Sequence, residues 1–572
     1  MIARPRIAPI ARCGAVMRTA AAMGFLLIGA AAPARAGTYN AGPGNYTAKL
    51  PLLQPGDTLL LAPGTYTQGL TLWNMSGLPG APIEIRGPSS GPAAVFTGRS
   101  CCNTVSLRDA AYLTIRNLTI DGLGLAVDGV KAESTGASAH DIVLENLTIV
   151  NHGANQQIVG INTKCPAWNW VIRRCVVIGA GTGLYLGDSN GGAPFVAGII
   201  EDNLVRDTIG YNMEIKHQLS RPSLPGMPMN AKTIIRRNVW SKASGASTGG
   251  NARPCVLVGH WPLSGPGSAD SYEIRGNFFW QNQATTERLF QGEGNIALYQ
   301  NLFVNDNGDA ISIQPHNDVP RTIRVFNNTV VAKGAGIQVT GGSTQFTQEV
   351  TANAVFASPA ISGGVQQANV TAAYSARSSF LTNPAGAPGV LDLYPLAGML
   401  IGPPAPAGSI NTYANWDRDW NDRVNDGTHR GAYAGSGSNP GWLPVLSRPG
   451  APPEIPDGRF VAGTPVTAAR LDPAGTSVAV TWDASCRVPS AHLVWGDLAV
   501  VASLQPQGSA CGLSGGVFTW SAPSGDLWFL VVADDLGDAE GSWGRDSSGA
   551  ERASGRVSGQ CGAIFRDNGG GC

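Results

Sequence analysis

The chain has 572 residues, a formal net charge of zero and only 14% charged residues. This sparse, balanced charge gives no electrostatic reason to expect nucleic acid or an anionic membrane as a partner, so we expect neither. The 75 Gly and 39 Pro indicate many turns and a β-rich fold, and the length is ample for two or three domains.

Residues 1–36 have the features of a secretory signal peptide. Four arginines precede an apolar stretch at 19–32, and Ala34-Arg35-Ala36 suits a signal peptidase. The apolar stretch is too short to span a membrane comfortably, and no other such segment follows. We therefore expect a secreted or periplasmic bacterial protein with a cleaved leader and no transmembrane segment.

A repeated pattern fills the middle of the chain, as in LTIRNLTIDG (113–122) and YEIRGNFFWQ (272–281). Apolar residues flank one asparagine in each repeat, and these asparagines recur every 24–39 residues: Asn117, Asn146, Asn203, Asn238, Asn277, Asn301, Asn328 and Asn353, with Cys175 at the equivalent place in one repeat. Short strands at this period predict a β-solenoid. Asn tolerates the left-handed backbone of a sharp corner, and stacked amides can bond to one another, so we interpret this ladder as structural.

Two further segments carry a family resemblance. The stretch PGDTLLLAPGTYTQGLTL (55–72) resembles the first turn, and 417–435 resembles the closing strand, of right-handed parallel β-helix proteins of the pectin-lyase-like superfamily. The resemblance implies an all-β fold with a cap and first coils at 37–110 and a right-handed parallel β-helix at 111–440. The superfamily includes lyases, hydrolases, esterases, epimerases and non-catalytic adhesins, so the fold alone does not decide the function.

The C-terminal part differs in composition. A linker rich in Pro and Gly at 441–463 precedes short apolar strands at 464–572, which predict a small β-sandwich and loosely resemble fibronectin-type-III-like modules. Nine cysteines remain after leader cleavage, so at least one is unpaired or bonded outside the chain, and four of them predict disulfides in this module: Cys486, Cys511, Cys561 and Cys572. Its tryptophans could stack on sugar, but a core role is the expected one.

The candidate site is a column of strand endings in successive coils. Segments such as YNMEIKH (211–217) and PCVLVGH (254–260) alternate inward and outward residues and end at a corner, where stacking would align five titratable side chains: Asp188, His217, His260, Glu293 and His316. Period-2 alternation places Met213 and Ile215 inside, with Glu214 and Lys216 outside. Long loops at 218–232, 241–254 and 261–271 border these coils and predict the walls of a groove.

Removal of a proton beside a uronate carboxylate, followed by loss of the glycosidic oxygen, fits these residue types. We expect Lys216, His217 and His260 as the catalytic base and acid. Substrate contacts are expected from Tyr185, Asp188, Arg221, Arg253, Arg288 and His316. The acidic residues Glu214, Glu293 and Asp318 could bind Ca²⁺, with Asp309 as a further candidate.

The piece Glu214-Ile215-Lys216 is similar to one in the chondroitinase B and alginate lyase family. That resemblance implies a lysine base, an arginine acid one coil later and a calcium site, although this chain has His260 near the place of that arginine. The sequence thus predicts a polysaccharide lyase acting on an acidic polysaccharide, as a monomer. A non-catalytic carbohydrate-binding or surface protein and a glycoside hydrolase stay open as alternatives.

Overall fold

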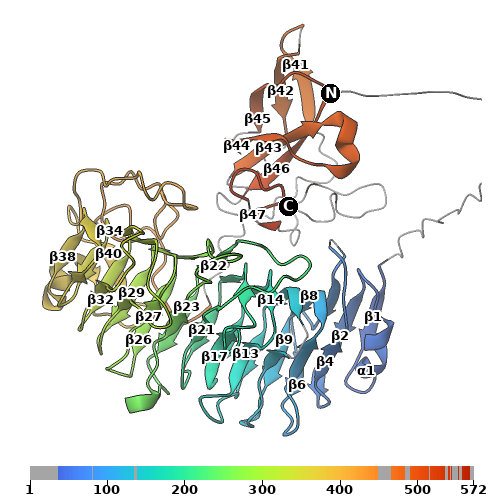
Figure 1. Ribbon diagram of the computed structural model, residues 1–572, viewed down its shortest axis with the longest axis horizontal. Coiled ribbons are helices and arrows are strands. Elements are labelled where there is room, and N and C mark those ends of the chain that lie inside the picture. Colours follow the sequence, from blue (N-terminus) through green and yellow to red (C-terminus); the bar gives the residue numbers. More distant parts are fainter. Residues whose placement is uncertain are drawn as a thin grey trace, which may run out of the picture. The chain divides into compact units, whose positions relative to one another are not determined.

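The computed structural model describes residues 36–79, 81–133, 138–448, 466–473, 475–482, 490–513, 516–534, 539–541, 543, 552, 557–563 and 565–566. The predicted signal peptide and Cys486 and Cys572 lie outside the described residues. Within them, the chain winds through coils whose strands line up as three long parallel sheets, A, B and C (Figure 1). This arrangement is the predicted parallel β-helix.

Each coil contributes strands to sheets A, B and C in turn. Sheet A consists of β1 (Thr38–Ala41), β2 (Thr58–Leu61), β5 (Ile83–Arg86), β8 (Ala110–Arg116), β11 (Ala139–Glu145), β15 (Val171–Arg173), β19 (Ile199–Glu201), β22 (Lys232–Arg236), β25 (Ser271–Arg275), β28 (Ile296–Tyr299), β31 (Ile323–Phe326), β34 (Gln348–Thr351) and β37 (Val365–Gln367). Two short strands extend it: β14 (Ala167–Trp168) pairs with β11, and β18 (Phe195–Val196) pairs with β14. Sheet B consists of β3 (Gly64–Tyr66), β6 (Ala94–Thr97), β9 (Leu118–Asp121), β12 (Thr148–Val150), β16 (Val176–Ile178), β20 (Leu204–Arg206), β23 (Val239–Lys242), β26 (Phe278–Asn282), β29 (Leu302–Asn305), β32 (Thr329–Ala332), β35 (Ala354–Phe356) and β38 (Val370–Ala372).

Sheet C carries the candidate site. It consists of β4 (Leu70–Trp73), β7 (Val105–Arg108), β10 (Val130–Ala132), β13 (Val159–Thr163), β17 (Thr182–Leu186), β21 (Met213–Ile215), β24 (Val256–Val258), β27 (Phe290–Gly292), β30 (Ile311–Ile313), β33 (Ile337–Val339) and β36 (Ile361–Ser362). Alternate residues of these strands point into the solenoid, where they join one continuous apolar core. Met213 and Ile215 are fully buried there, as the period-2 alternation predicts.

A ladder of buried asparagines occupies the corner between sheets A and B. Each Nδ2 donates to the Oδ1 of the next asparagine at 2.9–3.0 Å, in the order Asn203, Asn238, Asn277, Asn301, Asn328, Asn353 and Asn369. Each amide group also satisfies backbone groups of neighbouring coils, so the corner carries few unpaired buried polar atoms. Asn369 extends the ladder by one rung beyond the sequence repeat.

Asn117 and Asn146 lie one residue earlier in their coils than the buried ladder. The sheet register aligns Arg116 and Glu145 with Glu201, so Asn117 and Asn146 match Asp202, which precedes Asn203. This earlier position has the left-handed backbone, with φ of 58° at Asn117, 52° at Asn146 and 55° at Asp202. In the later coils, therefore, the ladder asparagine follows the left-handed residue instead of adopting that backbone itself.

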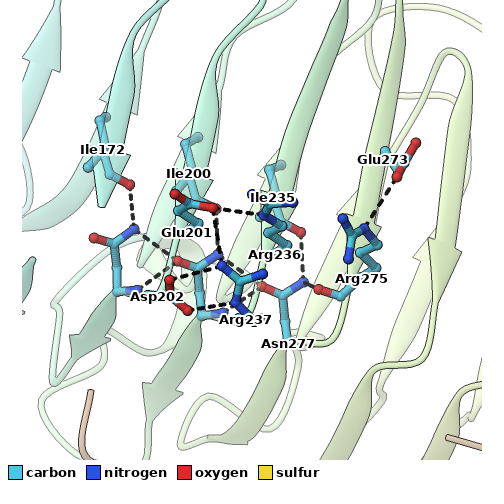
Figure 2. A network of polar contacts seen from close by, with 12 residues as sticks. Ile172, Ile200, Glu201, Asp202, Ile235, Arg236, Arg237, Glu273, Arg275 and Asn277 are labelled. Carbon is cyan, nitrogen blue, oxygen red and sulfur yellow. Dashed lines mark hydrogen bonds and ion pairs between the residues drawn. The ribbon is translucent and has the colours of Figure 1, made fainter. Parts of the chain in front are cut away.

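We expect Asn277→Ala to lower the free energy of unfolding by about 3 kcal/mol, measured by urea denaturation, because it leaves several buried groups without partners. The Asn277 amide accepts from the backbone and side chain of Asn238 and donates to the Ile235 carbonyl (Figure 2). The matched control is Asn146→Gly, since Asn146 is half-buried and Gly keeps its left-handed backbone without strain. Equal destabilisation by the two substitutions would contradict the ladder's structural role.

Charged residues line the same edge of sheet A. Glu201 accepts from Arg236 at 2.8 Å and from Arg237 at 3.3 Å, and Arg237 also pairs with Asp202 at 2.8 Å (Figure 2). Burial would raise the pKa of Glu201, but the three nearby guanidinium groups of Arg236, Arg237 and Arg173 outweigh burial and lower it to about 2. This network is therefore ionised and structural.

The open first coil and the outer face of sheet B are both covered. The short helix α1 (Tyr46–Lys49) and the following turn η1 (Leu50–Leu52) cap the first coil, with Tyr46 packed against Tyr66 and Phe96. After β38, residues 374–446 pack apolar side chains on the outer face of sheet B. This segment includes η3 (Tyr374–Ser379) and the antiparallel pair β39 (Leu381–Asn383) and β40 (Asp392–Pro395).

The C-terminal part forms two small sheets that share one core, as the predicted sandwich requires. Their strands pair antiparallel, except for one short parallel pair at the edge of the second sheet. One sheet contains β41 (Thr467–Arg470), β42 (Ser477–Thr481) and β45 (Val517–Ser521); the other contains β43 (Ser490–Asp497), β44 (Gly508–Leu513), β46 (Leu527–Asp534), β47 (Ala539–Glu540) and β48 (Phe565–Arg566), and η4 (Leu498–Ser503) follows β43. Trp482, Trp520 and Trp528 are at most 7% exposed, so they serve as core. Cys511 and Cys561 form a disulfide.

Among the described residues outside this sandwich, Cys101 and Cys102 form a disulfide between adjacent residues. Cys165, Cys175 and Cys255 are free and buried in the solenoid. The expectation of at least one unpaired cysteine is thus confirmed. Burial raises the pKa of the Cys165 and Cys255 thiols to about 12, which leaves them protonated and unreactive.

Candidate functional site

The five corner residues of the predicted column differ in exposure and in partners. His260 is 2% exposed, its Nε2 lies 3.1 Å from the Val319 carbonyl oxygen, and its Nδ1 contacts the carbonyl of Trp261. Both ring nitrogens therefore face backbone oxygens inside the corner between sheets C and A. His316 is exposed. The column does not form one group of side chains directed at a common ligand.

Glu293 organises this corner. Its Oε2 accepts from the backbone amides of His316, Asn317 and Asp318 at 2.7–3.0 Å, and its Oε1 accepts from the His260 amide at 3.1 Å. The side chain is buried, so the carboxylate substitutes for water around four backbone donors. Glu293 thereby fixes the loop after β30.

Asp188 and His217 belong to the same corner, three and two coils before Glu293. The Asp188 Oδ1 accepts from the Ala193 amide at 3.0 Å and closes the loop that follows β17. His217 is half-buried, and burial together with the neighbouring Lys216 ammonium lowers the pKa of its imidazole. His217 is therefore neutral at pH 7, a state compatible with a base.

His260→Ala is expected to act on stability rather than on chemistry. Loss of the buried ring leaves the Val319 and Trp261 carbonyls unpaired, which should lower the free energy of unfolding by about 2 kcal/mol in urea denaturation. The lyase activity expected from the sequence should stay near the wild-type rate below the unfolding transition. His316→Ala is the control, since this exposed ring should affect stability little. Full stability combined with lost turnover in the His260 variant would restore a catalytic role.

The three arginines expected to bind substrate are occupied within the protein. Arg221 is buried, forms an ion pair with Asp270, and donates to the carbonyls of Pro228 and Met229 at 2.9 and 3.1 Å. It therefore ties the 218–231 loop to the 261–270 loop. Arg253 donates to the Gly250 carbonyl at 3.2 Å and also to that of Ala252, and Arg288 lies 3.8 Å from both Glu287 and Asp309.

The predicted wall at 261–271 also lines a cavity of about 480 Å³. This cavity lies over sheet A rather than sheet C, because β25 and β28 contribute to its floor. Leu263, Ser271, Ile296, Arg321 and Tyr413 are among its lining residues.

The outer face of sheet C holds a compact polar group that includes Tyr185, Glu214 and Lys216 of the predicted site. The register pairs Asn162 with Tyr185 and Tyr185 with Glu214, so these three side chains occupy neighbouring coils. Lys216 Nζ lies 2.8 Å from Glu214 Oε1. Lys164, which follows β13, places its Nζ 3.7 Å from the centroid of the Tyr185 ring, and Lys216 Nζ lies 5.7 Å from the same ring.

The two lysines have opposite protonation tendencies. Burial and the nearby Lys131 ammonium lower the pKa of Lys164 to about 8, although carboxylates around it oppose this shift. Burial would also lower the pKa of Lys216, but the Glu214 carboxylate outweighs burial and raises it. Burial raises the pKa of the Tyr185 phenol, whose hydroxyl lies 2.8 Å from the Ser189 hydroxyl. At pH 8, Lys164 is thus partly neutral, Lys216 charged and Tyr185 protonated.

Asp128, Lys131 and Asn162 form a polar cluster on the coils before this group. Asp128 accepts from the Asn162 amide at 2.9 Å and from the Val159 backbone at 2.8 Å, and it pairs with Lys131 at 3.1 Å. Lys164 and these three residues are not among the sequence candidates. Period-2 alternation through VGINTK (159–164) would have found Asn162 and Lys164 on the outer face, since Val159 and Ile161 point inward.

The acidic residues expected to bind calcium do not come together. Glu214 is engaged by Lys216, both oxygens of Glu293 accept backbone amides, and the Asp318 Oδ1 accepts from the Val319 amide at 2.7 Å. Within the described ranges, no group of three His, Cys, Asp or Glu side chains is suited to a metal ion. These side chains do not fit a calcium site, so no step below uses one.

No protein-family model and no curated protein sequence matches the chain. Among solved structures, a GH136 lacto-N-biosidase from Eubacterium ramulus is similar over 59% of this chain and 67% of its own, with 14% identity and a TM-score of 0.39. An alginate lyase from Paenibacillus sp. str. FPU-7 is similar over 59% and 99%, with 18% identity and a TM-score of 0.34. The A-module of the Azotobacter vinelandii mannuronan C-5 epimerase AlgE4 is similar over 58% and 91%, with 15% identity and a TM-score of 0.31.

Similarity this low carries no argument about activity. The β-helix itself is evident from the three parallel sheets. In the described part of the chain, none of the helices has the length and apolar character needed to span a membrane.

Proposed function

We propose that the chain is a secreted polysaccharide lyase that cleaves a uronate-containing polysaccharide by β-elimination on the outer face of sheet C. The observation that carries the proposal is the contact between Lys164 and Tyr185, 3.7 Å from nitrogen to ring centroid, beside a Lys216 held by Glu214. This elimination needs a base, a cation and a proton donor. Lys164, an amine with a lowered pKa, can serve as the base, the charged Lys216 as the cation and the Tyr185 phenol as the proton donor.

Each group has a defined task in the proposed reaction. The neutral amine of Lys164 accepts the proton on C5 of the uronate, and the charged Lys216 stabilises the negative charge that develops on the carboxylate. The electron pair forms a double bond between C4 and C5, while the bond from C4 to the glycosidic oxygen breaks. The Tyr185 phenol donates its proton to that leaving oxygen and is later reprotonated from solvent, while Lys164 releases the proton taken from C5 to solvent.

The surroundings support these assignments. Glu214 is only 4% exposed and is paired, so it keeps Lys216 charged rather than offering a free acid to the substrate. Lys164, Tyr185 and Lys216 are each half-buried, which leaves part of each side chain accessible from solvent. A glycoside hydrolase would need two carboxyl groups free to face the substrate. The engaged state of Glu214 and Asp188 therefore favours the lyase over the hydrolase.

The test is incubation of the full-length protein with alginate, pectate and glycosaminoglycans, with ultraviolet absorbance monitoring the unsaturated uronate product. A rise on at least one polymer, lost in Tyr185→Phe, is the expected result. No rise on any uronate polymer, together with retained binding to one of them, would replace the proposal with the non-catalytic carbohydrate-binding alternative.

A further inference from the structure

One large aromatic side chain stands exposed on the face that carries the proposed site. Trp73 ends β4, the strand at which sheet C begins, and it is 47% exposed. Its position is fixed, because Nε1 donates to the Ser106 hydroxyl at 2.8 Å on the adjacent strand β7. An indole held this way presents an apolar surface to solvent at no further ordering cost.

Charged side chains lie between Trp73 and the site. The register pairs Trp73 with Arg108, whose Cζ lies 5.7 Å from the indole centroid. On the next strand, β10, Lys131 is paired with Ser106, two residues before Arg108. Lys164 comes directly after the end of β13. Among the described residues neither Arg108 nor Lys164 forms an ion pair, whereas Lys131 pairs with Asp128. Glu133, which follows β10 and is level with Arg108 and Lys164 in the register, accepts from the Asn103 side-chain amide.

From these observations we infer that Trp73 and Arg108 form a distal subsite for the same anionic polysaccharide. The indole stacks on one sugar ring and the guanidinium binds its carboxylate, while the polysaccharide crosses the strands of sheet C from β4 to β21. Figure 1 labels β4, β13, β17 and β21 along this sheet. The inference rests on the proposed function for the sugar class. Three steps between neighbouring coils, at about 4.8 Å each, separate Trp73 from Lys164 by about 14 Å.

A subsite at this distance predicts a dependence on chain length. Trp73→Ala should raise KM about tenfold for polymeric alginate or pectate, whichever is cleaved, and leave kcat near the wild-type value. Oligosaccharides too short to span the three coils should be cleaved equally by both proteins. The control is Trp442→Ala, because Trp442 is also exposed, at 41%, but packs against Trp420 away from sheet C. An equal effect on short and long substrates, or none on long ones, would overturn the inference.

Binding measurements separate this inference from the lyase proposal. In affinity electrophoresis through gels containing alginate or pectate, Trp73→Ala and Arg108→Gln should each be retarded about tenfold less than the wild type, while Trp73→Phe retains most of the retardation. This result would support the subsite even if no polymer were cleaved. Wild-type retardation of both Trp73→Ala and Arg108→Gln would overturn it even if the protein were a lyase.

Discussion

Lys164→Ala is expected to lower the rate of unsaturated product formation by about 10²–10⁴-fold, the usual contribution of a positioned general base. The amine has no substitute, because Lys216 is paired with Glu214 and its pKa is raised. KM should change less than kcat, since Lys216 and Tyr185 still contact the substrate. The measurement is initial-rate kinetics on the polymer that the wild type cleaves.

The pH dependence identifies the base independently of the rate. Lys164 must be neutral to accept a proton, and its pKa is lowered to about 8, so the wild-type rate should rise with pH through about 8. Tyr185 stays protonated across this range because its pKa is raised. Lys131→Met removes the ammonium that helps to lower the Lys164 pKa, so it should move the inflection to higher pH. An unchanged inflection in both the Lys131 and Lys164 variants would remove Lys164 from the base position.

Much of the fold could be predicted from the sequence, because each coil repeats short strands with inward-facing apolar residues. Inward apolar residues recur in each coil and a corner amide in most of them, and both leave visible periods in the sequence. The repeat pattern places the corner asparagine of the first coils one residue away from the ladder position of the structure. Asn117 and Asn146 occupy the left-handed position in their coils, whereas in the later coil Asp202 has the left-handed backbone and Asn203 follows it. Asparagine thus occurs at two adjacent positions of the corner, and the sequence alone does not separate them.

The site could be predicted only in part. Outward alternation placed Tyr185, Glu214 and Lys216 on one face, and the structure brings them together. The column of strand endings predicts the site less well. The strands end at a corner where backbone groups of the turns form hydrogen bonds with these side chains, which are then not directed at a ligand. Glu293 is taken up by four such amides, and the His260 ring faces two carbonyls. Sequence spacing does not distinguish a side chain that bonds to a turn from one that faces solvent.

Arg236→Met should lower the free energy of unfolding by about 3 kcal/mol at pH 7, because it leaves the Glu201 carboxylate with less compensation in a buried position. Glu201 is 4% exposed and Arg236 is 2% exposed, and their atoms lie 2.8 Å apart (Figure 2). Arg237 still reaches Glu201 at 3.3 Å, so part of the compensation remains. Denaturation in guanidinium chloride, followed by circular dichroism, measures the loss.

The control is Arg86→Met, since Arg86 occupies the same position of an earlier strand of sheet A, is 38% exposed in its side chain and lies 3.9 Å from Glu84. That partly exposed pair should contribute less than about 1 kcal/mol.

In the wild type, the pKa of Glu201 is lowered from 4.5 to about 2, so its stabilisation is present above pH 4.5 and is lost as pH falls through 2. In Arg236→Met the pKa rises, protonation of Glu201 relieves the uncompensated charge, and the difference from the wild type should shrink as the pH is lowered. The double variant Glu201→Gln/Arg236→Met should recover part of the loss at pH 7; a double variant less stable than Arg236→Met would show that the cost lies in packing rather than in the buried charge.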